Sequence, residues 1–139
     1  MKLTKNFTLE ELIKTNHNVN NLPSDFEINS LKTLCEKVLQ PIRDKFGYIR
    51  ITSGYRSAEL NKLIGGSTKP LSQHTKGEAV DFRCVNPQIV FEWIRENLEF
   101  DQLINEYNYA WIHVSFSKKN RKEVLECKNI KGKKTYIKL

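Results

Sequence analysis

Two of the three histidines in the chain lie in segments that have the sequence character of strands or strand entries. His74 precedes Asp81 by seven residues, and His113 lies further along the chain, between Ile112 and Val114. Two imidazoles and one carboxylate form a ligand set of catalytic zinc sites, in which a fourth position is open to water. These residue types therefore predict a zinc site with hydrolytic chemistry.

Each of the three residues also has a more ordinary explanation. A histidine in a polar loop, such as His74, is usually a solvated side chain. Asp81 is harder to explain in this way, because it lies among apolar strand residues and a buried carboxylate is costly unless it is paired or bound to a cation. His113 raises the same question within its own strand. One metal ion explains all three positions together, so we favour a metal site.

Glu106 is the candidate general base. It ends the first strand of an expected hairpin, whose tight turn we place over residues 108 and 109. If the turn contains two or four residues, so that Glu106 faces Trp111, then Glu106 and His113 share one face of the hairpin. A carboxylate there can accept a proton from water and pass it to a leaving amine. A three-residue loop reverses the face, and Glu106 is then only an exposed residue at a strand end.

Four further residues are candidates for substrate contact. Arg56 lies in a tight turn between a strand and a helix, where its guanidinium can hold a substrate carboxylate or carbonyl; a structural salt bridge is the alternative. Ser53 opens the same turn. Ser72 and Gln73 directly precede His74 and can hydrogen-bond to the ligand residue or to the substrate.

The elements that must position these residues begin with helices. Thr8 and Glu11 have capping-box spacing, which predicts a short helix to about residue 14. Ser24 predicts the start of a second helix, and Pro41 should break or kink it before it ends near residue 45. Further helices are expected over residues 57–64 and 87–97.

The predicted strands are short and contain many β-branched and aromatic residues. In the strand over residues 78–82, Ala79 and Asp81 should face one side of the sheet, and Val80 and Phe82 the other. Helices that precede a mostly antiparallel sheet with one inserted helix indicate an α+β fold. The other expected strands cover residues 48–52, 100–107, 111–116, 123–128 and 134–139, and residues 67–77 are expected to form a long loop.

Length and composition fit one domain over residues 1–139. The chain is 39% apolar and 28% charged, which is typical of a soluble globular protein. No apolar run is long enough for a signal peptide or a membrane span, so we expect synthesis in the cytoplasm, and nothing asks for more than a monomer. Cys35, Cys84 and Cys127 are odd in number and far apart, which argues against a disulfide framework. Cys84 either packs in the core or lies near the metal.

The net charge of +7 resides in the C-terminal segment. Residues 118–139 carry nine Lys and Arg against two Glu, whereas basic and acidic residues balance in the rest of the chain. This basic hairpin favours an anionic partner, such as cell-wall polymers, lipid headgroups or nucleic acid, unless it is only a solvated charged surface. Apart from Tyr136 it offers no aromatic side chain for stacking bases, so we do not expect nucleic-acid binding.

Taken together, the motifs resemble the zinc D-Ala-D-Ala carboxypeptidase family of metallopeptidases, and above all its phage-encoded, endolysin-like branch. The resemblance spans roughly residues 7–116. It is carried by Ser53-Gly54-Tyr55-Arg56-Ser57, Leu60-Asn61, Gly65-Gly66, Ser72-Gln73-His74, Gly77, Ala79-Val80-Asp81 and Trp111-Ile112-His113-Val114.

The resemblance implies that His74, Asp81 and His113 bind one zinc ion and that Arg56 binds substrate. It also implies the hedgehog/DD-peptidase fold, in which N-terminal helices pack on a small, mostly antiparallel sheet that carries the zinc site. The expected substrate is a stem or cross-link peptide of peptidoglycan. One position departs from the family, because several branches have an acidic base three residues before the last histidine, where this chain has Ala110.

Two functions follow from this departure. With Glu106 as the base, the chain is a zinc peptidase of phage or prophage origin that reaches the cell wall after lysis-linked release or as part of a virion. The bond that it cuts is then the terminal D-Ala-D-Ala bond, a cross-bridge or an L-Ala-D-Glu link. Without a base, it is a catalytically inactive, zinc-containing module that binds cell-wall peptides. We favour the peptidase.

Overall fold

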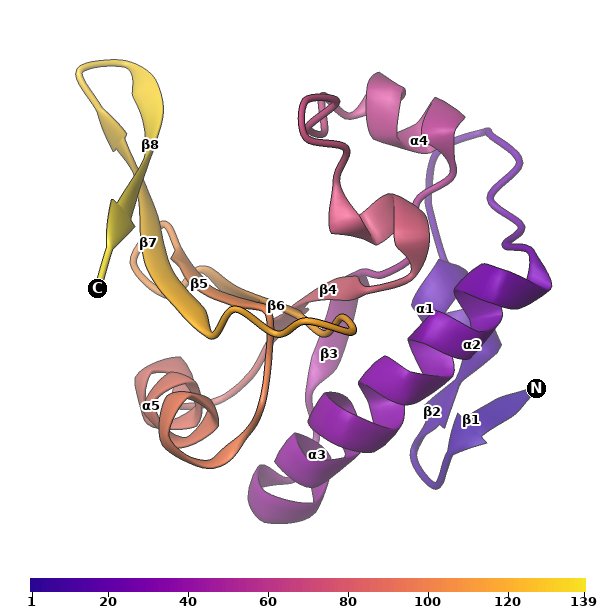
Figure 1. The fold of residues 1–139 in the computed structure, drawn as a ribbon, viewed down its shortest axis with the longest axis horizontal. Helices are drawn as coiled ribbons and strands as arrows, with labels where there is room; N and C mark the ends of the chain where they lie inside the picture. The colour runs from indigo at the N-terminus through magenta and orange to yellow at the C-terminus, as the bar shows by residue number, and fades with distance from the viewer.

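A six-stranded sheet forms the centre of the fold, and the computed structural model describes it together with the rest of residues 1–139 (Figure 1). Its strand order is β3-β4-β6-β5-β7-β8. All neighbouring strands are antiparallel except β5 and β7, which are parallel. The predicted α+β class is confirmed. The strands are β3 (Arg50–Ser53), β4 (Ala79–Arg83), β5 (Gln102–Glu106), β6 (Trp111–Ser115), β7 (Glu123–Ile130) and β8 (Lys133–Lys138).

The sheet has one apolar face and one polar face. Val80 and Phe82 of β4 are fully buried in the hydrophobic core, whereas Asp81, between them, points to the opposite face, as predicted. On β6, Ile112 and Val114 lie in the core and His113 lies between them. The alternation of side chains along these two strands therefore places the candidate ligands on the face that the core does not use.

The long N-terminal helix does not break at Pro41, so the predicted break is wrong, and the alternative of a kink stays a prediction. Instead, α2 (Asp25–Leu34), a π-helical turn (Cys35–Leu39) and α3 (Gln40–Phe46) follow one another without interruption. Within the π turn, the Gln40 N–H donates to the Cys35 carbonyl. Because Pro41 has no N–H to donate, a locally widened helix just before it lets the chain remain helical.

The remaining helices are α1 (Leu9–Ile13), α4 (Ala58–Leu63) and α5 (Pro87–Asn97). As predicted, Thr8 caps α1 by accepting a hydrogen bond from the Glu11 N–H at 3.2 Å. The sequence analysis missed a small ribbon of β1 (Lys2–Thr4) and β2 (Phe7–Thr8), whose strands are too short to show a period. No helix is both long enough and apolar enough to cross a membrane.

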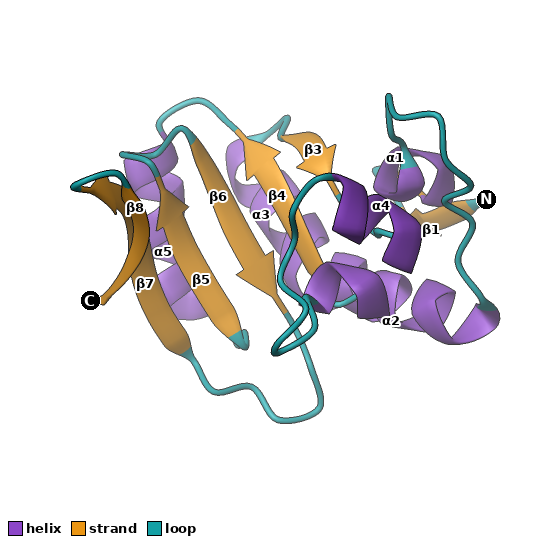
Figure 2. Cartoon of the chain, turned by 90° about the horizontal axis from the view of Figure 1, so that it is seen from above, coloured by secondary structure: helices purple, strands orange, loops and turns teal.

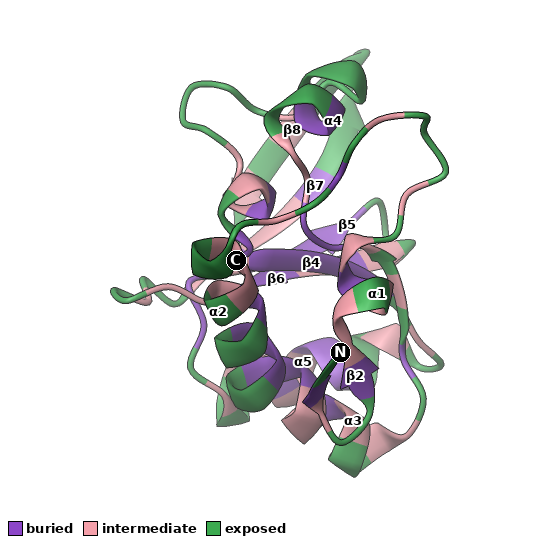
Figure 3. Cartoon of the chain, turned by 90° about the vertical axis from the view of Figure 1, so that its right-hand side faces the viewer, coloured by how far each residue is buried: buried purple, intermediate pink, exposed green.

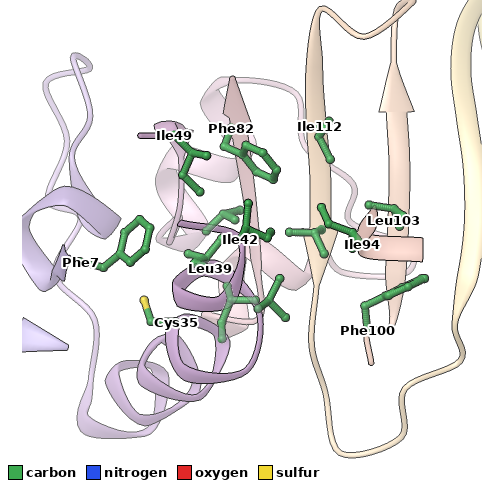
Figure 4. Close-up of a cluster of buried hydrophobic side chains, with 14 of the residues drawn as sticks. Phe7, Cys35, Leu39, Ile42, Ile49, Phe82, Ile94, Phe100, Leu103 and Ile112 are labelled. Atoms are coloured by element: carbon green, nitrogen blue, oxygen red, sulfur yellow. The ribbon is translucent and has the colours of Figure 1, made fainter. Parts of the chain in front are cut away.

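Helices α3 and α5 lie against the apolar face of the sheet (Figure 2). Fully buried side chains from the helices and the strands interdigitate between them (Figure 4), and burying each large aliphatic or aromatic side chain contributes about 1.5–3 kcal/mol. Strands β4 and β6 are largely buried, whereas β8 is mostly exposed (Figure 3). All three cysteines are free, and Cys84 packs against the core.

Candidate metal centre and active site

His74, Asp81 and His113 converge on the polar face of the sheet. One potential ligand atom from each lies within 4.8 Å of the others. Asp81 Oδ1 is 2.9 Å from His113 Nδ1 and 3.5 Å from His74 Nε2. Asp81 is the direct cross-strand partner of His113, so the β4–β6 register alone brings two of the three together. The expectation that these residues meet is confirmed, and their role as metal ligands stays a prediction.

A short 3-10 helix holds His74 in place. This helix, η2 (Gln73–Lys76), lies where the sequence analysis expected only loop. Ser72 caps it by accepting a hydrogen bond from the His74 N–H at 3.3 Å. The His74 Nδ1 lies 2.8 Å from the Gly54 carbonyl oxygen, which can only accept, so Nδ1 carries the proton. The Nε2 lone pair is therefore left for a metal, directed toward Asp81.

The charge states of the cluster suit metal binding. Burial lowers the pKa of His74, more than the nearby Asp81 raises it, which favours the neutral form of the imidazole. Burial alone raises the pKa of Asp81, but His74 and His113 together hold it well below its ordinary value. A neutral imidazole and an ionised carboxylate are the forms that bind a cation, and nitrogen and oxygen donors of this kind fit Zn²⁺.

Gly54, whose carbonyl oxygen lies beside His74, leaves no room for a side chain. A Cβ built on Gly54 lies 2.1 Å from the Leu12 carbonyl oxygen of α1, because the Tyr55 N–H donates to that oxygen at 2.7 Å. We expect Gly54→Ala to lower the free energy of unfolding by about 3 kcal/mol, since backbone must move to relieve the overlap. Urea unfolding measures this free energy.

Gly132→Ala is the control. A Cβ at Gly132 meets nothing within 4 Å, so only the positive φ of +81° lowers the stability of the variant, by about 1–2 kcal/mol. Equal losses in the two variants would contradict the prediction.

Glu106 lies on the same face as His113, as the general-base prediction requires. It pairs with Trp111 across the hairpin, and Ile104 pairs with His113. The turn contains four residues, Tyr107 to Ala110, rather than the expected tight two. The first three of them have positive φ. Glu106 is only 6% exposed, and burial followed by the charge of Asp81 raises its pKa. This carboxylate lines the same cavity as the metal cluster.

Arg56 joins the cluster from the turn that follows β3. Its guanidinium lies 3.5 Å from Asp81 Oδ2, and its Nε donates to Ser53 Oγ at 3.2 Å. A weaker contact at 3.4 Å connects it to Asn61 Oδ1. Arg56 lines the cavity, whereas Ser53 does not. Ser53 therefore supports Arg56 through this hydrogen bond. Because Ser53 does not line the cavity, the structure gives no support to its predicted contact with substrate.

Gln73 connects the His74 segment to the start of β5. Its Nε2 donates to Asp101 Oδ2 at 2.8 Å and to Glu78 Oε1 at 3.2 Å. Asp101 in turn accepts two hydrogen bonds from the Arg121 side chain, at 2.8 and 2.9 Å. The Gln73 Oε1 is buried and has no partner. Gln73 and Ser72 both line the cavity, so both remain candidates for substrate contact.

Asp101 makes the fold sensitive to acid. Burial alone raises its pKa, but hydrogen bonds from Arg121 and Gln73 bring it below the ordinary value of 3.8. Because the folded-state pKa is the lower one, ionised Asp101 stabilises the fold at neutral pH, and this contribution is lost as the pH falls through that value. The wild type should lose unfolding free energy as the pH is lowered from about 6 to about 2. We expect this loss to be smaller by about 1 kcal/mol in Asp101→Asn, which has no carboxylate at this position to protonate. Urea titrations check this, and parallel pH curves for variant and wild type would contradict it.

Sequence reasoning missed Asn21, a buried residue that supports the site. Asn21 donates to the carbonyls of Ile13 and Tyr55 at 2.8 and 3.0 Å and accepts from the Ser57 N–H at 2.7 Å. It thereby fixes the turn that carries Arg56. Its neighbours form a polar, asparagine-rich run, and nothing in the sequence distinguishes this one buried asparagine from the exposed ones.

The cluster lies in a cavity of about 1580 Å³. Residues of α2 and of the 65–78 segment line one side of the cavity, and β7 and β8 residues line the other. Figure 1 shows this arrangement: α4 and the following loop rise on one side of the sheet edge and the β7–β8 hairpin rises on the other. The β7–β8 residues that line the cavity are Leu125, Lys134 and Tyr136; the sequence analysis did not connect them with the site.

Comparison with known proteins adds one finding. A family model described as Peptidase M15 matches residues 5–115. No curated protein matches the sequence. The matched range contains the three clustered residues, Arg56 and Glu106, and it ends before the β7–β8 hairpin.

Proposed function

This chain belongs to the peptidase M15 family, and we propose that it is a zinc-dependent peptidase that cleaves stem or cross-link peptides of peptidoglycan. The observation that carries the proposal is the convergence of His74, Asp81 and His113 beside a buried glutamate in one cavity. M15 peptidases are zinc enzymes, in agreement with this donor set. The family match supports the peptidase chemistry, and the peptidoglycan substrate is our extension of it.

Three side-chain groups would hold the zinc ion: Nε2 of His74, the carboxylate of Asp81 and Nδ1 of His113. When bound, zinc supplies Lewis-acid polarisation of the scissile carbonyl and activation of water at neutral pH. The Gly54 carbonyl fixes the His74 ring through its other nitrogen, which is the usual arrangement for a metal-binding histidine. The backbone ladder between β4 and β6 keeps Asp81 and His113 together.

Glu106 supplies the proton transfers of the reaction. It lies on the cavity face of the hairpin, one diagonal step from His113. Its carboxylate accepts a proton from the attacking water and then delivers it to the leaving amine, so that one residue serves as base and acid. Burial raises its pKa toward the operating pH, which favours both steps. In this chain Glu106 therefore does what an acidic residue at position 110 does in other branches.

Arg56 is positioned to bind the peptide. Ser53 and Asn61 hold its guanidinium beside Asp81, so its donors are fixed before the substrate arrives. A fixed fork of donors suits a carbonyl or a carboxylate. The cavity extends on both sides of the cluster and is larger than the ~300–1000 Å³ of common ligand sites, which favours a peptide that continues beyond the scissile bond over a terminal dipeptide.

We also propose the setting in which the enzyme works. A phage or prophage origin, with action on the cell wall after lysis-linked release or as part of a virion, agrees with the endolysin-like resemblance. The basic segment 118–139 then gives the enzyme affinity for anionic cell-wall polymers. Retention on purified walls that weakens with salt is the expected signature of this contact.

The test is to incubate zinc-loaded and chelator-stripped protein with peptidoglycan and to identify the released fragments by mass spectrometry. We expect a new amine terminus only with the zinc-loaded protein, and its position names the bond. Zinc binding at one equivalent without any cleavage would instead establish the inactive cell-wall-peptide-binding module that Ala110 leaves open. Protein that binds no zinc and cuts nothing would contradict both functions.

A further inference from the structure

The β7–β8 hairpin is an addition to the part of the chain that the family model matches, which ends at residue 115. It joins the sheet through the parallel pairing of β7 with β5, the strand that carries Glu106. In Figure 1 the hairpin curls up from this edge of the sheet, on the side opposite α5. This chain therefore has its own wall on the Glu106 side of the cavity.

Strand register determines which side chains this wall presents. Glu106 pairs with Cys127, and Cys127 pairs with Tyr136, so these three residues share a face of the sheet. Lys134 lies two residues before Tyr136 and therefore points the same way. Both Lys134 and Tyr136 line the cavity, in agreement with this register. Lys133, the first residue of β8, precedes Lys134 and points to the other face, and it does not line the cavity.

Lys134 forms no direct ion pair with a carboxylate, although it lies close enough to Glu106 for the two charges to interact. Among the basic residues of the segment, Arg121, Lys122 and Lys128 form ion pairs with carboxylates, whereas Lys134 forms none. Its Nζ lies 5.4 Å from the centre of the Tyr136 ring. An aromatic face at this distance attracts an ammonium group and restricts where it lies, yet leaves its donors available for a hydrogen-bonding anion.

Other cations of the cavity are less suited to bind an anion beside Glu106. Arg56 is engaged by Asp81, and Arg121 by Asp101. Lys76 lines the cavity from η2, and Lys118 and Lys119 line it from the connection before β7. All three lie outside the strand pairing that sets the position of Lys134. Lys134 is thus the unpaired cation that the sheet register places on the general-base side.

We propose that Lys134, supported by Tyr136, is a substrate-binding residue that binds a carboxylate of the peptide on the Glu106 side of the metal site. The inference rests on the proposed peptidase function and adds a specificity for acidic peptides to it. The carboxylate belongs either to the C-terminus of the peptide or to the side chain of an acidic residue near the scissile bond. Both offer the same ammonium-binding chemistry.

The experiment uses the zinc-loaded full chain and synthetic stem peptides in matched pairs. One pair differs in a free or amidated C-terminus, and the other in glutamate or glutamine next to the cleaved bond. Lys134→Gln should raise KM about fivefold for the peptide that carries the recognised carboxylate, with kcat within about twofold, as expected for an exposed ion pair. The same variant should not change KM for the matched amide. Lys133→Gln, on the opposite face, is the control and should match the wild type.

The pair that responds identifies the carboxylate, and either response supports the proposal. An unchanged KM in Lys134→Gln with all four peptides would overturn it. A loss that falls on kcat equally for acid and amide would also overturn it, because Lys134 would then act through Glu106 and not on the substrate. Wild-type protein that cleaves none of the peptides and no peptidoglycan is a failure of the proposed function itself, and so is distinguishable from these outcomes.

Discussion

Glu106→Gln is expected to lower kcat of the zinc-loaded enzyme about a thousandfold, because a positioned general base typically contributes this much. Glutamine keeps the size of the side chain and its place on the cavity face, but its amide cannot accept the proton of the attacking water. Zinc stoichiometry should stay at one per chain, since Glu106 is not a member of the cluster. The measurement is the initial rate of amine release from peptidoglycan, together with zinc content of the same sample.

Glu126→Gln is the matched control. Glu126 lies on the adjacent strand β7, paired with Asn105, and it does not line the cavity. Its substitution changes the net charge by the same amount and should leave kcat within about twofold, as expected for a half-exposed residue outside the site. If Glu106→Gln keeps more than about a tenth of the wild-type rate, another group is the base and the assignment of Glu106 is wrong.

Asp81→Asn is expected to weaken zinc binding by at least about a hundredfold. Loss of a residue that only hydrogen-bonds to a metal ligand weakens metal binding by up to about a hundredfold, and loss of a ligand should cost at least as much. The carboxylate is the one anion of the cluster, and it lies within 3.5 Å of both histidines and of Arg56. An amide in its place leaves two imidazoles and a guanidinium around the metal position, with no anion among them, so the loss is electrostatic as well as geometric. Competition against a chromophoric chelator measures the affinity.

Asp44→Asn serves as the control for this measurement. Asp44 is exposed on α3, where it accepts a hydrogen bond from Gln40, and it belongs to the helix that packs on the other face of the sheet. Its variant should bind zinc like the wild type. Equal affinities for Asp81→Asn and wild type would show that zinc binds elsewhere on the chain.

The sequence predicted the residues of the cluster and the faces of the strands that carry them. Alternation along β4 separates Asp81 from Val80 and Phe82, and this local rule survives in the folded chain because the core uses one face only. The Glu106 prediction depended on a turn length, and the four-residue turn met the stated condition. For these residues, the alternation of side chains along the strands and the register of the hairpin were sufficient to predict which face each one occupies.

Other features depend on contacts that a sequence does not display. Pro41 was expected to break or kink a helix, but a π-helical turn just before it lets the helix continue without a break. Asn21 is buried by its hydrogen bonds to distant backbone, and no local pattern marks it. The parallel pairing of β5 with β7 joins segments separated by a whole strand, so the position of Lys134 in the cavity follows only from the assembled sheet.

The most direct test of the metal centre is a crystal structure of the zinc-loaded protein with data collected at the zinc absorption edge. We expect one anomalous peak per chain, in contact with Nε2 of His74, the Asp81 carboxylate and Nδ1 of His113. A peak at any other position, or none at full zinc loading, would contradict the metal site on which the proposed peptidase chemistry depends.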